Sequence, residues 1–170
     1  RTGVRRVRDL FVVQCCVGQR ISDLQKVVDQ FNEDPSRKTL KVKTKKTRET
    51  VPVPVMNLVR LVAERNGGRL PDVGAHAKFN RLLKDAARLS GLFEDTVLKG
   101  GINIKKSDLI SSHVARRSFV TVGLNKGIPA KVIMAITGHK NEPELNRYNV
   151  PSDQQLVGWF EQGGFGDLAA

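Results

Sequence analysis

Apolar residues recur along most of this chain with the period of an amphipathic helix. From Val4 to Val17 they follow one another at three- and four-residue steps, which places them on one helical face. Similar stripes, ended by glycine or by turn-forming residues, predict further helices, with Ser22 as the cap of the second. The predicted helices cover residues 4–17, 21 to the turn-rich segment 32–36, 57–65, 75–89, 112–125 and 129–137, and residues 151–160 fit one more.

The period changes to two in the segment 40–55. Leu40, Val42 and Thr44 alternate with lysines, and the valines of 51–55 alternate with prolines. This pattern predicts a β-hairpin that turns near 46–49, and its second strand should be an edge because proline cannot donate to a ladder. If the alternation continued into the turn, Lys46 would share the face of the apolar residues and point toward the body of the domain.

A second, shorter hairpin is predicted around Gly100 and Gly101. Helices and hairpins together predict an α+β fold that is mainly α-helical, with a small antiparallel β-sheet or hairpin. A chain of 170 residues, 39% of them apolar, is long enough for one domain with a proper core. We therefore expect residues 1–170 to form a single domain, with 151–170 as its C-terminal tail.

The net positive charge of the chain indicates which kinds of molecule it binds. Lys and Arg number 29 against 17 Asp and Glu, which gives a net charge of +12 and a pI near 10.2. A polyanion, above all nucleic acid, is the first partner to consider, and an acidic membrane surface is the alternative. The sequence has no apolar run long enough to span a membrane and no signal-peptide cleavage site, and Cys15 and Cys16 are adjacent, which offers no disulfide framework. These features favour a cytoplasmic protein.

The densest basic run extends from Arg37 to Arg48. A solvated strand face is one interpretation, and a ribbon laid against phosphates is the other. The net charge of +12 favours the ribbon. The side chains that we expect to bind DNA from this region are Lys41, Lys43, Lys45 and Arg48.

Several polar residues are candidates for chemistry, although each has a structural interpretation when it is taken alone. His113 and Arg116 are three residues apart and fall on one face of a helix's first turn, where free amide groups attract phosphate. His139 follows Gly138, Arg20 lies at a junction between two predicted helices three residues before Asp23, and Tyr148 is the one tyrosine of the chain.

Taken in order, these residues resemble the catalytic domain of the tyrosine recombinases, or phage-type integrases. The resemblance covers nearly the whole chain and lies in five motifs. Among the members of the family, integrases carried by bacterial mobile elements are the most similar. The motifs are Val17-Gly-Gln-Arg20-Ile-Ser-Asp23, Lys46-Thr-Arg-Glu-Thr-Val-Pro-Val-Pro54, His113-Val-Ala-Arg116-Arg117, Thr137-Gly-His139, and Tyr148. Two features differ from the usual pattern: Asn149-Val150-Pro151 follows the tyrosine, and the segment Phe93–Lys106 is longer than in many members.

The resemblance implies a role for each motif residue. Tyr148 would be the nucleophile, Arg20, Arg116 and His139 would bind the phosphate, and Lys46 would be the general acid. His113 would accept a proton, Asp23 would orient Arg20, and Arg117 would contact DNA. The catalytic lysine is one of Lys43, Lys45 and Lys46, and the distance of Lys46 from Pro54 favours Lys46.

The same resemblance implies a protein that acts on double-stranded DNA without a cofactor or metal. A full-length integrase would carry a core-binding domain before this one and would assemble as a tetramer on DNA, whereas the isolated domain would be a monomer in a bacterial cytoplasm, associated with the nucleoid. Three alternatives stay open. They are a type IB topoisomerase, a non-enzymatic DNA-binding regulator, for which residues 129–138 could form part of a helix-turn-helix, and a relative that has lost catalysis.

Overall fold

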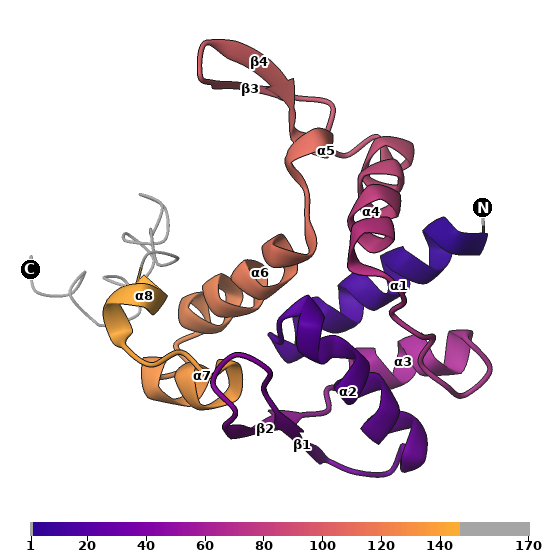
Figure 1. Cartoon of the computed structure of the whole chain (residues 1–170), viewed down its shortest axis with the longest axis vertical. Coiled ribbons are helices and arrows are strands. Elements are labelled where there is room, and N and C mark those ends of the chain that lie inside the picture. Colours follow the sequence, from indigo (N-terminus) through magenta and orange to yellow (C-terminus); the bar gives the residue numbers. More distant parts are fainter. Residues whose placement is uncertain (1, 147–170) are drawn as a thin grey trace, which may run out of the picture.

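The computed structural model describes residues 2–146 of the chain. Helices dominate, and they are joined by two antiparallel hairpins (Figure 1). The helices are α1 (Thr2–Val17), α2 (Ile21–Glu33), α3 (Asn57–Arg65), α4 (His76–Ser90), α5 (Lys106–Leu109), α6 (Ser112–Asn125), α7 (Ala130–Thr137) and α8 (Glu142–Asn146), and the strands are β1 (Thr39–Lys43), β2 (Thr50–Pro54), β3 (Thr96–Lys99) and β4 (Ile102–Lys105).

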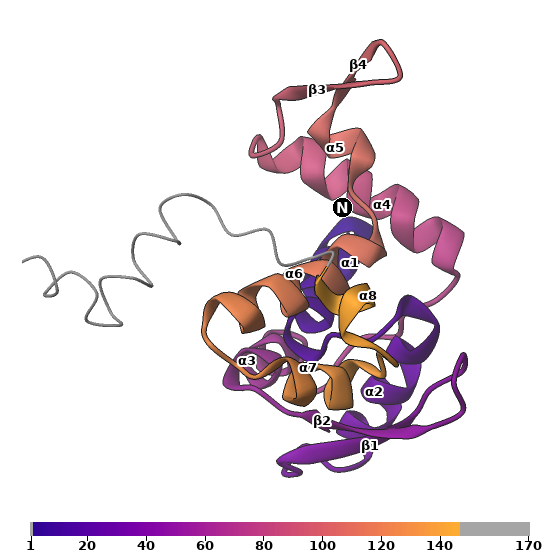
Figure 2. The same cartoon turned by 90° about the vertical axis from the view of Figure 1, so that its left-hand side faces the viewer.

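Helix α1 is the centre of the fold. It packs against α3, α4 and α6, and its stripe of Val7, Leu10 and Val13 is completely buried. These side chains belong to the larger of two apolar clusters, while the smaller one joins α6 to α7 and α8. Because α1 is covered on several sides, its C-terminal end lies at the middle of the domain (Figures 1 and 2).

The first hairpin is bound to α2. Leu40 of β1 pairs with Val53 of β2, and the inward side chains of both strands are buried whereas the lysines of β1 are exposed. The side-chain amide of Gln30 on α2 donates to the carbonyl of Lys41 (2.7 Å) and accepts from its N–H (3.0 Å). The unpaired edge of β1 is therefore capped by a helix side chain, which fixes the hairpin on the body of the domain.

The second hairpin projects from the rest of the molecule. Strands β3 and β4 pair in register around the turn at Gly100 and Gly101. The two views place them beyond α5 and the end of α4, away from the remaining elements (Figures 1 and 2).

The predicted fold class is confirmed: the domain is mainly helical with two small antiparallel hairpins. Gly18, Gly91 and Gly138 follow the last residues of their helices, as predicted, and each has a positive φ. The prediction of Ser22 as a cap was wrong, because Arg20 is the N-cap of α2 and its side chain makes no capping hydrogen bond. Helices α5 and α8 were not predicted, and the helix predicted at 151–160 lies outside the described residues.

No helix within residues 2–146 is both long and apolar enough to cross a membrane.

Candidate active site

Three of the predicted site residues surround one cavity. It has a volume of about 220 Å³ and lies between the start of α2 and the start of α6. Arg20 approaches it from the junction of α1 and α2, and His113 and Arg116 approach it from the first turns of α6. The lining residues are Gln14, Arg20, Ile21, Ser22, Ser112, His113 and Arg116.

Arg116 is almost fully buried, and two hydrogen bonds fix its guanidinium. Nη1 donates to the carbonyl of Gly18 at 2.9 Å, and Nη2 lies 3.0 Å from Nε2 of His139. The residue is only 2% exposed. Since an arginine stays protonated at any pH that proteins experience, this guanidinium brings a permanent positive charge to the wall of the cavity.

The hydrogen bonds around His139 show which of its two ring nitrogens carries the proton. Thr137 Oγ1 lies 2.7 Å from the carbonyl oxygen of Ile133, which can only accept, so the hydroxyl donates there. The same hydroxyl lies 2.8 Å from Nδ1 of His139 and must accept from it. Nδ1 therefore carries the proton, and Nε2 accepts from Arg116. His139 in this arrangement holds Arg116 in place.

Glycine at position 18 is required by packing and by backbone conformation. A Cβ atom there would lie 2.4 Å from the ring of Phe119, and the backbone has a φ of +66°. This close approach of α1 to α6 is what brings the Gly18 carbonyl within reach of Arg116. Gly18 thus both ends helix α1 and provides the carbonyl that binds Arg116.

The cavity leaves one buried donor and one buried acceptor without partners. Arg20 Nη1 and Gln14 Oε1 are both buried, and neither has a hydrogen-bond partner among the described residues. Both residues line the cavity. An unpartnered buried polar atom destabilises a protein by about 1–3 kcal/mol, so a ligand or a water molecule that pairs with these atoms would bind favourably.

Two glutamines connect the arginine-bearing junction to α7. The side-chain amide of Gln14 donates to the carbonyl of Gln19 at 3.0 Å. Gln19 in turn donates to the carbonyl of Ile136 at 2.6 Å, one residue before Thr137. Because both glutamines are nearly or fully buried, the position of Arg20 is coupled to that of the His139 segment.

The turn of the first hairpin lies against the segment that carries His139. Thr44 is buried and its hydroxyl bonds to Thr47 (2.6 Å) and to the carbonyl of Glu49 (3.2 Å). A Cβ atom at Gly138 would lie within 4 Å of Thr44, Thr47 and Val51. The lysine-bearing turn and the histidine motif are therefore neighbours.

The prediction that Lys46 points toward the body of the domain was wrong. Strand β1 ends at Lys43, Thr44 takes the last inward position, and Lys46 is exposed in the turn. The alternation stops because the hydrogen bonds of Thr44 close the turn at that point. Lys46 as the catalytic lysine stays a prediction that rests on the resemblance alone.

Asp23 has partners other than the predicted one. Its fully buried carboxylate accepts from the backbone N–H of Lys45 at 2.7 Å and lies 3.4 Å from the ammonium of Lys26. No hydrogen bond or ion pair within the described part of the chain joins it to the Arg20 side chain. Asp23 thus fastens the hairpin turn to the first turn of α2, three residues after Arg20.

The predicted DNA-binding residues all lie at the surface. Their side chains are exposed on β1, in the following turn and on α6, and they are Lys41, Lys43, Lys45, Arg48 and Arg117. Arg48 adopts a φ of +59°, which turns the chain back into β2 without a glycine. None of these cations lines the cavity.

The environment of His113 favours its neutral form. Partial burial lowers the pKa of its imidazole below the usual value, and the nearby charges of Arg116, Arg117 and Arg20 lower it further. A neutral imidazole at the rim of the cavity can accept a proton at pH 7. Burial has the opposite consequence for the cysteines, because it raises the pKa of Cys15 to about 12 and that of Cys16, so neither provides a thiolate.

Tyr148 lies outside the described residues. Within residues 2–146, no group of three or more histidine, cysteine, aspartate or glutamate side chains is placed to hold a metal ion. Sequence reasoning gave no role to Gln14 and Gln19. The only signal in the sequence is a polar residue, Gln14, inside the apolar stripe of α1.

Comparisons with known proteins place this geometry in context. The model of the phage integrase family matches residues 5–155. No curated protein matches the chain. Among solved structures, the chain is similar to the XerA recombinase, with 16% sequence identity, a TM-score of 0.65, and coverage of 94% of this chain and 58% of that one.

Two structures of DNA complexes share the fold. The Tn1549 transposon integrase in complex with circular intermediate DNA is 16% identical, with a TM-score of 0.59 and coverage of 91% of this chain and 57% of that one. The XerH recombinase bound to its difH substrate is 15% identical, with a TM-score of 0.59 and coverage of 94% and 46%. The chain thus spans about half the length of these proteins.

Proposed function

Because the chain belongs to the phage integrase family of tyrosine recombinases, we propose that it cuts and rejoins DNA strands as a site-specific recombinase, for the integration or excision of a mobile element. The observation that carries the proposal is the convergence of Arg20, His113 and Arg116 on one cavity. His139 lies behind it, held against Arg116 by Thr137. Positive charge, a buried unpaired donor and a neutral imidazole together suit a phosphodiester.

The proposed reaction exchanges one phosphoester for another. The phenolic oxygen of Tyr148 attacks the phosphorus atom, a new bond forms between them, and the bond from phosphorus to the 5′-oxygen breaks. The products are a 3′-phosphotyrosyl link and a free 5′-hydroxyl. When the 5′-hydroxyl of a partner strand attacks the link, the tyrosine leaves and the strands are rejoined. Covalent catalysis retains the energy of the phosphoester, so no ATP is consumed.

The arginines stabilise the charge that grows on the nonbridging oxygens. Arg116 is already oriented by Gly18 and His139, and Arg20 has an unpaired Nη1 at the cavity. A guanidinium that is placed before the substrate arrives needs no reorganisation in the transition state. As phosphate oxygens pair with both guanidiniums, the donor left unsatisfied in the free protein gains its partner.

Two protons move in this scheme. His113 accepts the proton of the tyrosine hydroxyl, which its lowered pKa allows at neutral pH. Lys46 gives a proton to the departing 5′-oxygen. The packing of the hairpin turn beside Gly138 supports this role, because it holds the lysine-bearing segment next to the histidine motif.

The proposed partner is double-stranded DNA. Two relatives with this fold are described in complexes with DNA, and the exposed cations on β1 and its turn provide contacts for phosphates. We propose further that residues 1–170 act as the catalytic domain of a longer integrase whose other domain closes around DNA, and that four full-length copies assemble on it. Action on the bacterial chromosome would place the protein in the cytoplasm.

A covalent-adduct assay tests the proposed function. The full-length protein is incubated with a nicked suicide duplex that carries the joined ends of its mobile element, beside the Tyr148→Phe variant, and the products are separated on a denaturing gel. We expect a protease-sensitive adduct with the native protein and none with the variant, although both should bind the duplex equally. Binding without an adduct from the native protein would leave a DNA-binding module or an inactive relative.

A second readout separates recombination from topoisomerase activity. Relaxation of a supercoiled plasmid by the protein as a monomer, without exchange between two duplexes, would favour a type IB topoisomerase. Exchange of strands between two labelled duplexes would favour a recombinase.

A further inference from the structure

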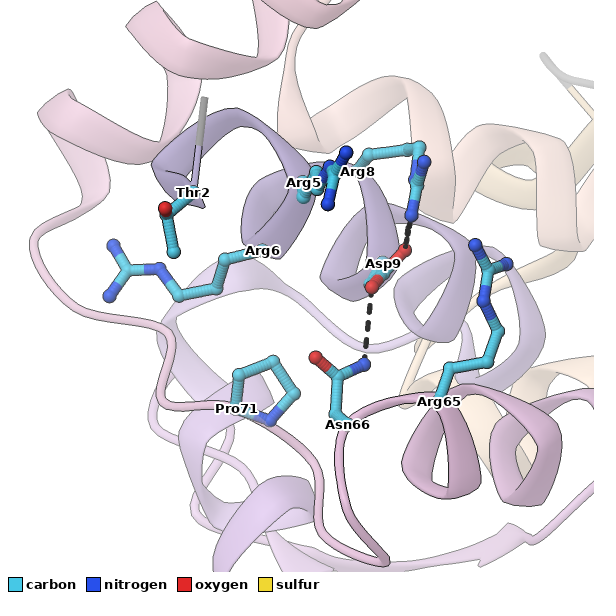
Figure 3. Close-up of a pocket in the computed structure, with 8 residues that line it drawn as sticks. All are labelled: Thr2, Arg5, Arg6, Arg8, Asp9, Arg65, Asn66 and Pro71. Carbon is cyan, nitrogen blue, oxygen red and sulfur yellow. Dashed lines mark hydrogen bonds and ion pairs between the residues drawn. The ribbon is translucent and has the colours of Figure 1, made fainter.

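A pocket lined by arginines lies on the first half of α1, apart from the candidate active site (Figure 3). It has a volume of about 630 Å³ and is bounded by α1, the end of α3 and the connection from α3 to α4. We call it the arginine pocket. Its lining residues are Thr2, Arg5, Arg6, Arg8, Asp9, Arg65, Asn66 and Pro71.

The positive charges of the pocket exceed its negative charge. Asp9 is the one acidic residue among the lining residues, and it is already engaged, accepting from Arg8 at 2.7 Å and from the amide of Asn66 at 3.1 Å. Arg5 and Arg65 have no ion pair or hydrogen bond within residues 2–146, and Nε of Arg6 is buried without a partner. Arg6 extends from α1 below Thr2, whereas Arg8 and Arg65 lie on the side of Asp9 (Figure 3).

An anion that entered the pocket would stabilise this arrangement. Like charges close together repel each other, and a buried donor without a partner destabilises the fold. Helix α1 adds to the positive potential, because its N-terminus borders the pocket at Thr2 and its first turn contains no acidic residue. The planar donors of several guanidiniums match the oxygens of phosphate groups.

The arginine pocket and the candidate active site are at different ends of α1. Arg6 precedes Val17, the last residue of the helix, by eleven positions, which corresponds to roughly 17 Å at the rise of an α-helix. A phosphate in the pocket is therefore not the phosphate that Tyr148 would attack.

We propose that the arginine pocket binds the phosphodiester backbone of duplex DNA at a point away from the cleaved phosphate. The proposal extends the proposed function, since both take duplex DNA as the ligand, but it does not depend on the chemistry. The net charge of +12 draws polyanions to the whole domain. A DNA backbone is favoured over an acidic peptide because the proposed function already brings duplex DNA to this domain. Contact at both sites would orient the duplex on the domain.

The salt dependence of DNA binding tests the proposal. The test variant combines Arg5→Gln with Arg65→Gln, two exposed side chains without partners whose loss spares the core. The matched control is Arg88→Gln on α4, which also removes an exposed arginine, but one already paired with Asp85 (3.0 Å) and Asp108 (2.5 Å). Binding of a fluorescein-labelled duplex of arbitrary sequence is followed by anisotropy across a series of potassium chloride concentrations.

Each phosphate contact contributes about 0.9 to the slope of log affinity against log salt concentration. We expect the slope of the double variant to be shallower by about two, and that of Arg88→Gln to equal the native slope. Equal slopes for the native chain and the double variant, or no binding by the native chain, would overturn the proposal. If the double variant loses binding of labelled polyglutamate and keeps its DNA slope, the ligand is an acidic protein segment and the DNA proposal is wrong.

The adduct assay distinguishes a failure of the arginine pocket from a failure of the proposed function. Tyr148→Phe should abolish the adduct and keep the native salt slope. A native chain that forms no adduct but loses slope in the double variant would refute the chemistry and support the arginine pocket. The reverse pattern would refute the arginine pocket alone.

Discussion

Replacing Thr137 by valine should weaken the site without replacing any residue proposed to contact DNA. Valine has nearly the same shape as threonine but no hydroxyl, so Nδ1 of His139 loses the acceptor at 2.8 Å. His139 is only 8% exposed, and water does not readily replace the lost partner. The imidazole is then no longer held in the tautomer whose Nε2 accepts from Arg116.

The size of the effect follows from the cost of an unpaired buried N–H, about 1–3 kcal/mol. We expect the free energy of unfolding to fall by about that amount. If the loss of orientation of Arg116 is of the same size in the transition state, cleavage slows by about 5- to 150-fold. Thr137→Ser keeps the hydroxyl and gives up one buried methyl group, so it should lose about 1 kcal/mol of stability and most of its rate should remain.

The assay is single-turnover cleavage of the suicide duplex at saturating protein, beside urea unfolding of the three proteins. Thr137→Val should be slow and Thr137→Ser close to native in rate. A valine variant that cleaves as fast as the serine variant would show that the orientation of His139 through Thr137 has no part in the reaction.

Three further predictions concern other parts of the site. Gly18→Ala should destabilise the fold by about 3 kcal/mol or more, because the new Cβ would lie 2.4 Å from Phe119 and the backbone has a φ of +66°. Gly127→Ala, with a φ of +74° but open space around it, should lose only about 1 kcal/mol. Both losses are measured by urea unfolding, and equal losses would contradict the packing argument. Lys46→Ala should slow cleavage of an ordinary 5′-oxygen about 100-fold or more and of a 5′-thio leaving group far less, and equal slowing would reject the general acid. Burial and nearby arginines lower the pKa of His113, so its imidazole should stay neutral somewhat below pH 6.5. In a plot of cleavage rate against pH, the rate should therefore decline below pH 6.5, and in Arg117→Gln this decline should move to higher pH. The free energy of unfolding should also fall as the pH drops below 6.5 in the native protein, but less in His113→Gln.

The helices could be predicted because each carries its own local signals. An apolar stripe with the helical period and a glycine at the end are sufficient for α1, α4 and α7, whose last turns end at Gly18, Gly91 and Gly138. The hairpin at β1 and β2 could also be predicted from its alternation. The short helices α5 and α8 have no room for a periodic pattern, so the sequence contains no comparable signal for them.

The turn of the first hairpin could not be predicted in detail. Its geometry depends on the hydroxyl of Thr44, on the left-handed backbone of Arg48 and on a bond from the Lys45 N–H to Asp23, which is 22 residues away in sequence. None of these is visible as a local pattern. The resemblance implied that Asp23 orients Arg20, whereas in the structure its carboxylate accepts from the hairpin turn.

The buried polar network shows why sequence order alone left the site incomplete. Its bonds join segments that are far apart in the chain: Arg116 to Gly18 and Gln19 to Ile136. Each bond ends on a backbone carbonyl, which any residue type provides, so no side-chain motif marks it. The motif residues would supply the groups that face the phosphate, and part of their rigidity comes from these carbonyl contacts. Substitutions at Gln19 or Gly18 should therefore affect catalysis through the placement of Arg20 and Arg116, although neither residue would touch DNA.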